Sequence, residues 1–506
     1  MDMLLGLDVG TTASKALLLS VEGEVITSAS HGHGLITPRE GWVEQDPEDL
    51  WLGVIAVCRA VLENVKPQDR VLALSLSSQA GTTIPVDATG QPLRNAISWM
   101  DHRARSQSEH VRNTVGAGKI YEISGWRLGN GLPLLHISWL RECEPDTFSS
   151  ARHFLFVNDF IIHRLTGQLC MNPSDAGITQ LYNIAQGQWD HDMLEIAGIE
   201  PDQLSPMRNS GTVVGHVTEQ ASRETGLPTS TLVVNGAHDQ YCAAVGAGVL
   251  KQGDIMLSCG TAWVILCLIE HLRLDSEKRL SISRHAIPGK WGALRSLGGV
   301  GASLEWLLDN LWASGGGDRS DLYDELNRRV SNVPPGSRGM LCFPSSGAHG
   351  RGSRGGFIGL TLSHSLDDMA RAVMEGITFE LRWTLEDIRD SGISPGKLRM
   401  VGGAARSSIW SKIVADVTNV PVVIPSTTEA AGCGAAILAG VGSKVFADPE
   451  SGYQALSGHE TILESDKKNV EVYDELFGIY RTASQQLQDP LSRLSEFGDS
   501  HSTSIT

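Results

Sequence analysis

Two glycine-threonine turns, each lying between two apolar segments, constrain the fold of this chain more than any other feature. The first joins the segments MLLGLD (3–8) and SKALLLS (14–20). The second lies within KQGDIMLSCGTAWVILCLI (251–269). Both read as two strands joined by a short turn with no helix between them. Because 506 residues are too many for one hydrophobic core, the repeated pattern predicts two large domains of related architecture.

The spacing of apolar residues outside these turns predicts an α/β fold. Residues 46–65 are predicted as a helix, with Asp46 as its N-cap and Pro47 at its first position, and RVLALSLS follows as a strand. The second half alternates in the same way, and strands alternating with helices indicate parallel pairing. Its predicted elements are a helix capped near Asp367 and ended by Gly392, the strand KLRMVGG, the helix SSIWSKIVADVTN, the strand PVVIP and the helix TEAAGCGAAILAGVG.

The segment AVGAGVLKQGD (244–254) is rich in glycine and alanine and predicts the domain boundary. We therefore expect an N-terminal domain over residues 1–246 and a C-terminal domain over residues 247–445. Residues 446–506 are expected to form a C-terminal helix and a disordered polar tail.

Composition indicates an ordinary globular protein of the cytoplasm. The net charge of −17 argues against nucleic acid or an anionic membrane as the main partner, because phosphate groups attract basic surfaces. The 8 cysteines form no C-x-x-C pair, which favours buried thiols in a reducing compartment. Neither a signal peptide nor an apolar stretch of about 20 residues is present, so we expect no membrane span.

Asp239 lies in TLVVNGAHDQYCAAVGAG (231–248), between a predicted strand and a predicted helix. Two interpretations of this position are open. An aspartate there can cap the helix by accepting a backbone N–H. Alternatively, it is a catalytic base held rigidly at the mouth of a cleft.

The two turns themselves are candidates for phosphate binding. In DVGTTASK (8–15), the backbone N–H groups and the hydroxyls of Thr11 and Thr12 could hold phosphate, Lys15 could add charge, and Asp8 could hold Mg²⁺. The stretch is not a P-loop, because a strand follows it instead of a helix. The alternative is a hairpin with a surface lysine. Gly260 and Thr261 occupy the equivalent second turn.

Two further stretches carry weaker signals. In MVGGAARSS (400–408), Gly402 and Gly403 could let a ligand approach the backbone, although paired glycines are also a common packing device. In ISWMDHRA (97–104), Trp99, Asp101 and Arg103 alternate and would share one side of an extended segment, which suits a polyhydroxyl ligand. The alternative is an ordinary Asp–Arg pair beside a packed tryptophan. No dinucleotide-binding fingerprint or G-x-S-x-G motif is present.

Taken together, these stretches resemble the FGGY family of carbohydrate kinases, from about residue 3 to about residue 443. The resemblance rests on several motifs in the family's order. They are DVGTTASK, GWVEQDPEDLW (41–51), WMDHR (99–103), GAHDQYCAAVGAG, SCGTAW, GGVGASLEWL (298–307), GGFIGLTLSHSLDDMARAVMEG (355–376) and VGGAARSSIW, the last being particularly similar to xylulose kinases.

The resemblance implies two actin-like (ribonuclease H-like) domains with an interdomain cleft, and ATP and Mg²⁺ as cofactors. It implies that Asp239 is the general base and that Asp8 lies near the metal. The implied ATP-binding residues are Thr11, Thr12, Lys15, Gly260, Thr261, Gly301, Glu305, Gly402, Gly403, Ala404 and Ser407. The implied substrate-binding residues are Gln79, Trp99, Asp101, Arg103, His238 and Gln240, with a structural role for His238 left open.

The chain departs from the family pattern in two stretches, one of them at positions where the residues differ between xylulose kinases and glycerol kinases. Xylulose kinases usually carry Met-His, and glycerol kinases Arg-Glu, where this chain has Ala80 and Gly81. The family's first signature usually has Pro-Lys where this chain has Pro133 and Leu134. We therefore expect a small sugar or polyol acceptor such as the pentulose xylulose. The alternatives are glycerol, a tetritol or a ribulose-type substrate, or a nucleotide-gated binding protein that resembles actin or chaperone ATPases. Dimers are frequent among relatives, so a homodimer is also open.

Overall fold

The computed structural model describes residues 1–312, 319–345, 354–427 and 429–502, and the chain forms two compact units. Unit 1 comprises Met1–Gln252, Leu268–Ala293 and Glu429–Gly458. Unit 2 comprises Gly253–Cys267, Leu294–Thr428 and His459–Thr506. The α/β class with two domains is confirmed. The units are discontinuous in sequence, however, whereas we expected each domain to be one continuous segment.

Unit 1 is built on a six-stranded sheet in the order β11-β12-β5-β1-β2-β3. Strand β1 is antiparallel to β2 and parallel to β5, and β5 is parallel to β12. The predicted pair of strands joined by the first turn is therefore confirmed, and β2 is also antiparallel to β3. The strands are β1 Asp2–Val9, β2 Ala13–Ser20, β3 Val25–Gly32, β5 Arg70–Ser78, β11 Val213–His216 and β12 Leu232–His238.

Helices and short strand pairs complete unit 1. The helices are α1 Pro47–Leu62, α2 Arg105–Thr114, α3 Ala117–Ser124, α4 Pro133–Cys143, α5 Pro145–Ser150, α6 Val157–Thr166, α7 Pro173–Ile178, α8 His191–Ala197, α9 Glu219–Thr225, α10 Asp239–Gly246, α15 Ala430–Gly442 and α16 Pro449–Leu456. The short strands are β4 Glu44–Gln45, β6 Ile84–Val86, β7 Ala96–Ile97, β8 His153–Leu155, β9 Tyr182–Asn183, β10 Gln188–Trp189 and β15 Ser281–Arg284.

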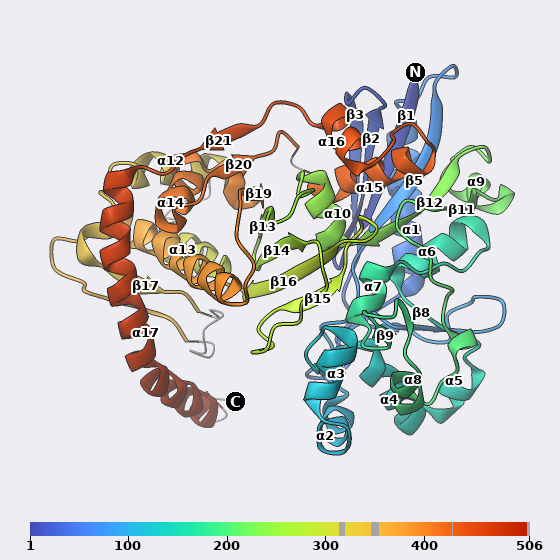
Figure 1. The fold of residues 1–506 in the computed structure, drawn as a ribbon, viewed down its shortest axis with the longest axis horizontal. Helices are drawn as coiled ribbons and strands as arrows, with labels where there is room; N and C mark the ends of the chain where they lie inside the picture. The colour runs from blue at the N-terminus through green and yellow to red at the C-terminus, as the bar shows by residue number, and fades with distance from the viewer. Residues whose placement is uncertain (313–318, 346–353, 428, 503–506) are drawn as a thin grey trace. The chain divides into compact units, whose positions relative to one another are not determined.

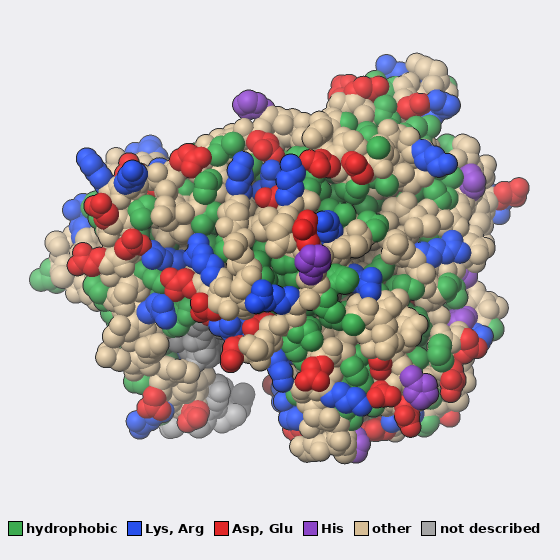
Figure 2. Space-filling model, in the orientation of Figure 1, with side chains coloured by type: hydrophobic (Ala, Val, Ile, Leu, Met, Phe, Trp, Pro, Cys, Tyr) green, Lys and Arg blue, Asp and Glu red, His purple; other side chains and the backbone are tan. Residues whose placement is uncertain are grey.

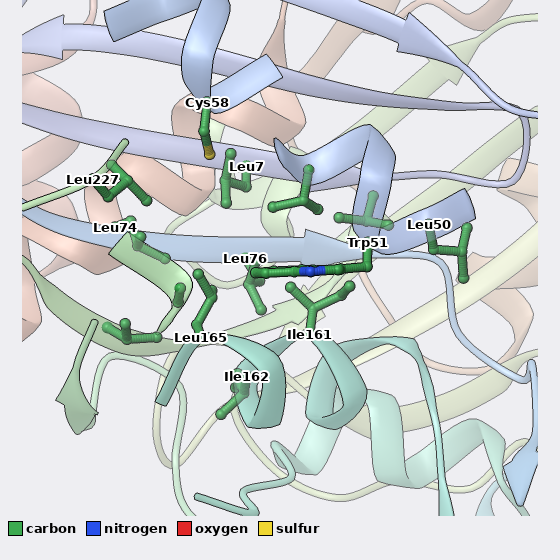
Figure 3. Packing of buried hydrophobic residues seen from close by; sticks show 14 of the residues in the cluster. Leu7, Leu50, Trp51, Cys58, Leu74, Leu76, Ile161, Ile162, Leu165 and Leu227 are labelled. Carbon is green, nitrogen blue, oxygen red and sulfur yellow. The ribbon is translucent and has the colours of Figure 1, made fainter. Parts of the chain in front are cut away.

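The core of unit 1 lies between the sheet and the helices α1 and α6. Alternate residues of β1 and β5, such as Leu7 and Leu76, face the helical residues Trp51 and Ile161 (Figure 3). Helix α1 begins as predicted, since Asp46 accepts a hydrogen bond from the Glu48 backbone N–H and Pro47 is the first helical residue.

Helix α15 packs on β1 although it lies far from that strand in sequence (Figure 1). The approach is so close that a Cβ atom on Gly6 would lie 1.9 Å from the Gly432 carbonyl oxygen. Only glycine permits this contact. This packing explains why residues 429–458 belong to unit 1.

Unit 2 contains a mixed sheet in which β13 is antiparallel to β14 and parallel to β19, and β19 is parallel to β20. The predicted hairpin over residues 251–269 is therefore confirmed. The strands are β13 Ile255–Cys259, β14 Trp263–Ile269, β16 Trp291–Gly298, β17 Leu341–Phe343, β18 Gly356–Ile358, β19 Leu398–Gly402, β20 Val422–Ile424 and β21 Thr461–Leu463.

The helices of unit 2 are α11 Ala302–Leu307, α12 Arg319–Val330, α13 Leu366–Asp390, α14 Ser408–Thr418 and α17 Lys467–Ser502. The N-cap of α13 is Ser365, two residues before Asp367, and its side chain accepts a hydrogen bond from the Asp368 backbone N–H. Helix α17 continues to Ser502, through most of the segment expected to be disordered, and residues 503–506 lie outside the described chain. Among the described residues, no helix combines the length and the apolar character needed to cross a bilayer.

Candidate functional site

The candidate site of unit 1 lies at the carboxyl ends of the parallel strands β1, β5 and β12. Asp8 pairs in register with Ser77, and His238 pairs with Ser78, so these polar residues end neighbouring strands. Ligands of open α/β sheets bind at this edge. Asp239 follows directly as the first residue of α10.

Asp239 is not the cap of its helix. The N-cap of α10 is His238, and no side chain caps the helix. The Asp239 side chain is about one third exposed, with His238 Nε2 3.1 Å from Oδ1 in a geometry outside that of a hydrogen bond. The capping interpretation is therefore wrong, and the carboxylate lies beside the imidazole instead of bonding the first turn of its helix.

A third carboxyl group, that of Asp175 on α7, is buried and interacts with the charges of His238 and Asp239. Nothing in the sequence marked Asp175 as a candidate site residue. Burial raises the pKa of Asp175 to about 7, and the charge of His238 opposes the rise. Burial lowers the pKa of His238, but the charges of Asp239 and Asp175 outweigh it and raise that pKa above its usual value. In the sequence, Asn172, Pro173 and Asp175 read as an ordinary helix start, and Asn172 does cap α7.

Asp8 is suited to a cation. Burial raises the pKa of its carboxyl to about 6; the hydrogen bond from Ser77 opposes this rise, and the charge of Asp239 adds to it. A cavity of about 290 Å³ opens beside Asp8 and is also lined by Lys15 and Glu429. Magnesium typically binds one or two carboxylates together with water and substrate phosphates, so one buried acid at this edge fits it. Lys15 Nζ is 3.1 Å from Glu429 Oε2, so it is paired within unit 1.

The turn between β1 and β2 presents backbone donors. Among the described residues, neither the Thr11 nor the Thr12 backbone N–H donates a hydrogen bond. The Thr11 hydroxyl accepts a hydrogen bond of 3.1 Å from Trp99 Nε1. Successive free N–H groups in such a turn form an anion-binding concavity.

The segment 99–103 is not extended, which corrects our expectation that its three side chains share one side. The Asp101 backbone N–H bonds the Ser98 carbonyl oxygen in a turn, so Trp99 is 44% exposed while Asp101 and Arg103 are 0% and 8% exposed. Arg103 donates to Asp101 and to Glu44, and its guanidinium stacks over Trp42 at 3.8 Å. The structure therefore places Asp101 and Arg103 in a buried ion-pair cluster.

Gln79 is also buried, with 3% exposure. Its side chain donates to the Gly10 carbonyl oxygen and to Gln45 Oε1. Gln240 is half-buried, and its Oε1 has no hydrogen-bond partner among the described residues. Of the predicted substrate-binding residues, Trp99 is therefore exposed and Gln240 has an oxygen without a partner, whereas Gln79, Asp101 and Arg103 are held by the protein.

The candidate site of unit 2 is a cavity of about 400 Å³. Most of the predicted ATP-binding residues line it. Gly402 precedes the lining residue Gly403 in the chain. The lining residues among those predicted are Gly260, Thr261, Gly301, Glu305, Gly403, Ala404 and Ser407. The sequence missed further lining residues, including Trp263, Tyr323, Asn327, Met374 and Trp410.

Polar and aromatic groups line different parts of this cavity. The Ser407 hydroxyl donates to Asn327 Oδ1 over 2.6 Å, and Tyr323 donates to Glu305. The rings of Trp263 and Trp410 lie 5.2 Å apart. Apolar walls with a few placed polar groups are typical of small-ligand sites.

The surface carries charges of both signs. Acidic and basic side chains are interspersed over the face shown in Figure 2. This pattern differs from the basic stripe typical of proteins that bind nucleic acid.

The sequence matches the FGGY family of carbohydrate kinases in both halves. The N-terminal domain of that family matches residues 3–246 and its C-terminal domain matches residues 255–443. A xylulose kinase of Bacillus subtilis is 30% identical over 508 residues, which cover 98% of this chain and 99% of that one. A gluconokinase of Bacillus subtilis is 27% identical over 509 residues, with 98% of each chain covered. The crystal structure of xylulose kinase from Rhodospirillum rubrum superposes with a TM-score of 0.88 at 27% identity, covering 97% of this chain and 100% of the other.

Proposed function

Because the chain belongs to the FGGY family of carbohydrate kinases, we propose that it transfers the γ-phosphoryl group of ATP to a hydroxyl of a pentulose such as xylulose. The xylulose kinase of Bacillus subtilis supports this acceptor, since it is similar over almost the whole length of both chains. The gluconokinase of that species supports a hexonate instead, and it covers this chain equally well.

The observation that carries the proposal is the position of Asp239. It lies at the carboxyl end of β12, one third exposed, with its Oδ1 accepting no hydrogen bond among the described residues. A sugar hydroxyl is a poor nucleophile near neutral pH and must lose its proton as the P–O bond forms. A positioned carboxylate can accept that proton, and we assign this role to Asp239.

Asp8 would hold Mg²⁺, and the free N–H groups of Thr11 and Thr12 would bind phosphate oxygens. The metal would neutralise charge on the phosphates. Lys15 remains a predicted phosphate ligand, and its ion pair with Glu429 would have to open for that role.

The nucleoside would occupy the cavity of unit 2. Gly301, Ala404 and Ser407 line this cavity, and the Ser407–Asn327 pair offers a hydroxyl and an amide to the sugar or base. Trp263 and Trp410 supply the apolar wall.

Gly81 bears on the choice of acceptor because it lies beside Trp99. Its φ of +82° disfavours other residues, and a Cβ atom there would lie 3.1 Å from the Trp99 Cβ. The large side chains that xylulose kinases usually carry at this place are therefore replaced by a tight backbone turn beside Trp99. A related polyol, such as a tetritol, a ribulose-type sugar or glycerol, is the alternative acceptor.

A coupled assay of ADP release across pentuloses, tetritols, glycerol and hexonates tests the proposal. We expect the highest kcat/KM for a pentulose, and a preference for a hexonate would reassign the acceptor while keeping the kinase activity. ATP turnover stimulated by a peptide, with no acceptor on the panel active, would contradict the proposal.

A further inference from the structure

Three backbone carbonyl groups of the turn between β1 and β2 all accept hydrogen bonds from the protein. The Gly10 oxygen accepts from Gln79 Nε2 over 3.3 Å, and the Thr11 oxygen accepts from Gln45 Nε2 over 2.8 Å. The Thr12 oxygen accepts from the His33 backbone N–H over 2.9 Å. Two side chains and one backbone N–H, all outside the turn, therefore fix its peptide planes.

Each fixed carbonyl determines where the next N–H points. The C=O of one residue and the N–H of the next lie in one planar trans peptide and point in opposite directions. Gln79, by holding the Gly10 carbonyl, turns the Thr11 N–H away from the protein, and Gln45 does the same for the Thr12 N–H. These are the two N–H groups that donate no hydrogen bond among the described residues.

The two glutamines also hold each other. Gln79 Nε2 donates to Gln45 Oε1 over 3.1 Å, and the two residues are 3% and 1% exposed. The orientation of both amides is determined by their partners, since a backbone carbonyl oxygen can only accept and must face Nε2. Gln45 lies on β4, which is paired with β7, so the brace is anchored in a strand ladder.

We infer that Gln45 and Gln79 are positioning residues that hold the turn 10–12 in an anion-binding conformation before a nucleotide arrives. The inference rests on the proposed function, in which this turn binds phosphate oxygens of ATP, and it replaces the substrate-binding role predicted for Gln79. Preorganised donors bind an anion more tightly than donors that must first be oriented.

The test compares ATP with adenosine, which lacks phosphates, by titration calorimetry on the full chain. The variant Gln45→Met replaces the glutamine with an unbranched side chain of similar length that has no hydrogen-bond donor. The Thr11 carbonyl oxygen therefore loses its partner. We expect ATP to bind roughly tenfold more weakly, a change of about 1.4 kcal/mol, because the Thr12 N–H is no longer held toward the phosphates. The adenosine Kd should stay unchanged. Gln79→Met should have the same effect, and the double variant should be less than additive because the two amides form one network.

Thr231→Val is the matched control, because it removes a buried hydrogen bond of 2.9 Å to the Val71 carbonyl at the other end of β5. The ratio of the two dissociation constants should stay at the wild-type value in this control. Equal weakening of ATP and adenosine in the glutamine variants, or no weakening of either, would overturn the inference while leaving the proposed kinase intact. A wild-type protein that binds ATP no better than adenosine would overturn both.

Discussion

His238 Nε2 lies 3.1 Å from Asp239 Oδ1, and the same imidazole is subject to the charge of the buried Asp175. Both acids raise the pKa of His238 against the opposing effect of its burial. The imidazole also contacts the Tyr241 ring, with centroids 5.6 Å apart. The His238 backbone N–H donates a hydrogen bond to the Ser174 hydroxyl. The charged imidazole therefore lies directly beside the carboxylate of the proposed base.

The first prediction follows from this pair. His238→Gln removes the positive charge, so it should lower kcat by about tenfold on the acid side of the raised pKa of His238. Above that pKa the wild-type imidazole is neutral as well, so the two pH–rate profiles should converge.

His136→Gln is the control for this experiment, because burial lowers the pKa of His136 to about 3 and its replacement removes no charge. The pH–rate profile of His136→Gln should match that of the wild type. A constant ratio between the His238→Gln and wild-type profiles at all pH values would contradict the electrostatic role.

The second prediction concerns Asp101. Asp101 accepts hydrogen bonds from the Val43 and Arg103 backbone N–H groups and from the Arg103 guanidinium, so an amide at this position would face donors. Asp101→Asn should reduce the free energy of unfolding by about 3–5 kcal/mol, the usual cost of breaking a buried ion pair. Chemical denaturation would measure it.

The exposed pair of Arg152 and Asp202 provides a control, since Asp202→Asn should cost no more than about 1 kcal/mol. If Asp101→Asn instead raised the KM of the acceptor and left stability unchanged, the residue would have the substrate-binding role that the sequence predicted.

The third prediction tests the proposal that the cavity of unit 2 binds the nucleotide. A Cβ atom on Gly301 would lie 2.3 Å from the Gly260 carbonyl oxygen and 2.9 Å from that of Thr261, so Gly301→Ala must displace the turn between β13 and β14. Overpacking of this kind costs about 1–3 kcal/mol, and we expect the Kd of ATP to rise about tenfold or more.

Gly299→Ala is the matched control, since a Cβ atom there meets no atom within 4 Å. It should bind ATP as the wild type does. Equal ATP affinity in the two variants would show that this turn is not part of the nucleotide site.

The fourth prediction concerns the pH dependence of stability. Burial raises the pKa of Asp159 to about 7 from an ordinary value of 3.8. Protonation therefore favours the folded state, and the contribution of Asp159 to stability falls as pH rises from the lower value to the higher one. The loss is on the order of 4 kcal/mol.

Asp159→Asn should remove this part of the pH dependence. An amide keeps the hydrogen bond from the Phe156 backbone N–H and can donate to the Ser205 hydroxyl, which now donates to the acid. The variant should therefore be more stable than the wild type at pH 8 but not at pH 4. Parallel stability curves for the two proteins would contradict the assignment.

The parts of the fold with strong local signals were predictable. Asp46, Pro47 and the apolar spacing after them defined α1, and uninterrupted apolar runs defined β1 and β13. The grouping of the chain into units was not predictable, because it depends on the contact between Gly6 and Gly432, and a glycine does not reveal which backbone approaches it.

In the candidate site, too, residues with a local sequence signal were predictable and contacts made by tertiary packing were not. Asp8 lies near the end of the apolar strand β1, Asp239 directly follows β12, and Gly260 and Thr261 lie in the turn after β13, so each position carried a local sequence signal. Gln79 carries the side chain of a ligand-binding residue, but its partners are Gly10 and Gln45, which only tertiary packing brings to it. The pair of Asp101 and Arg103 is local, and the sequence left it open as the alternative to a ligand-binding role. Asp175 was missed because it lies in the first turn of a helix, where aspartate is common, and the sequence does not show that this one is buried.

Asp239→Asn tests the central claim most directly. An asparagine keeps the size of the side chain but cannot accept the proton of the acceptor hydroxyl. With the best acceptor of the panel, we expect kcat to fall by roughly 10²–10⁴-fold while the Kd of ATP changes by less than about twofold. Turnover close to that of the wild type in this variant would contradict the account.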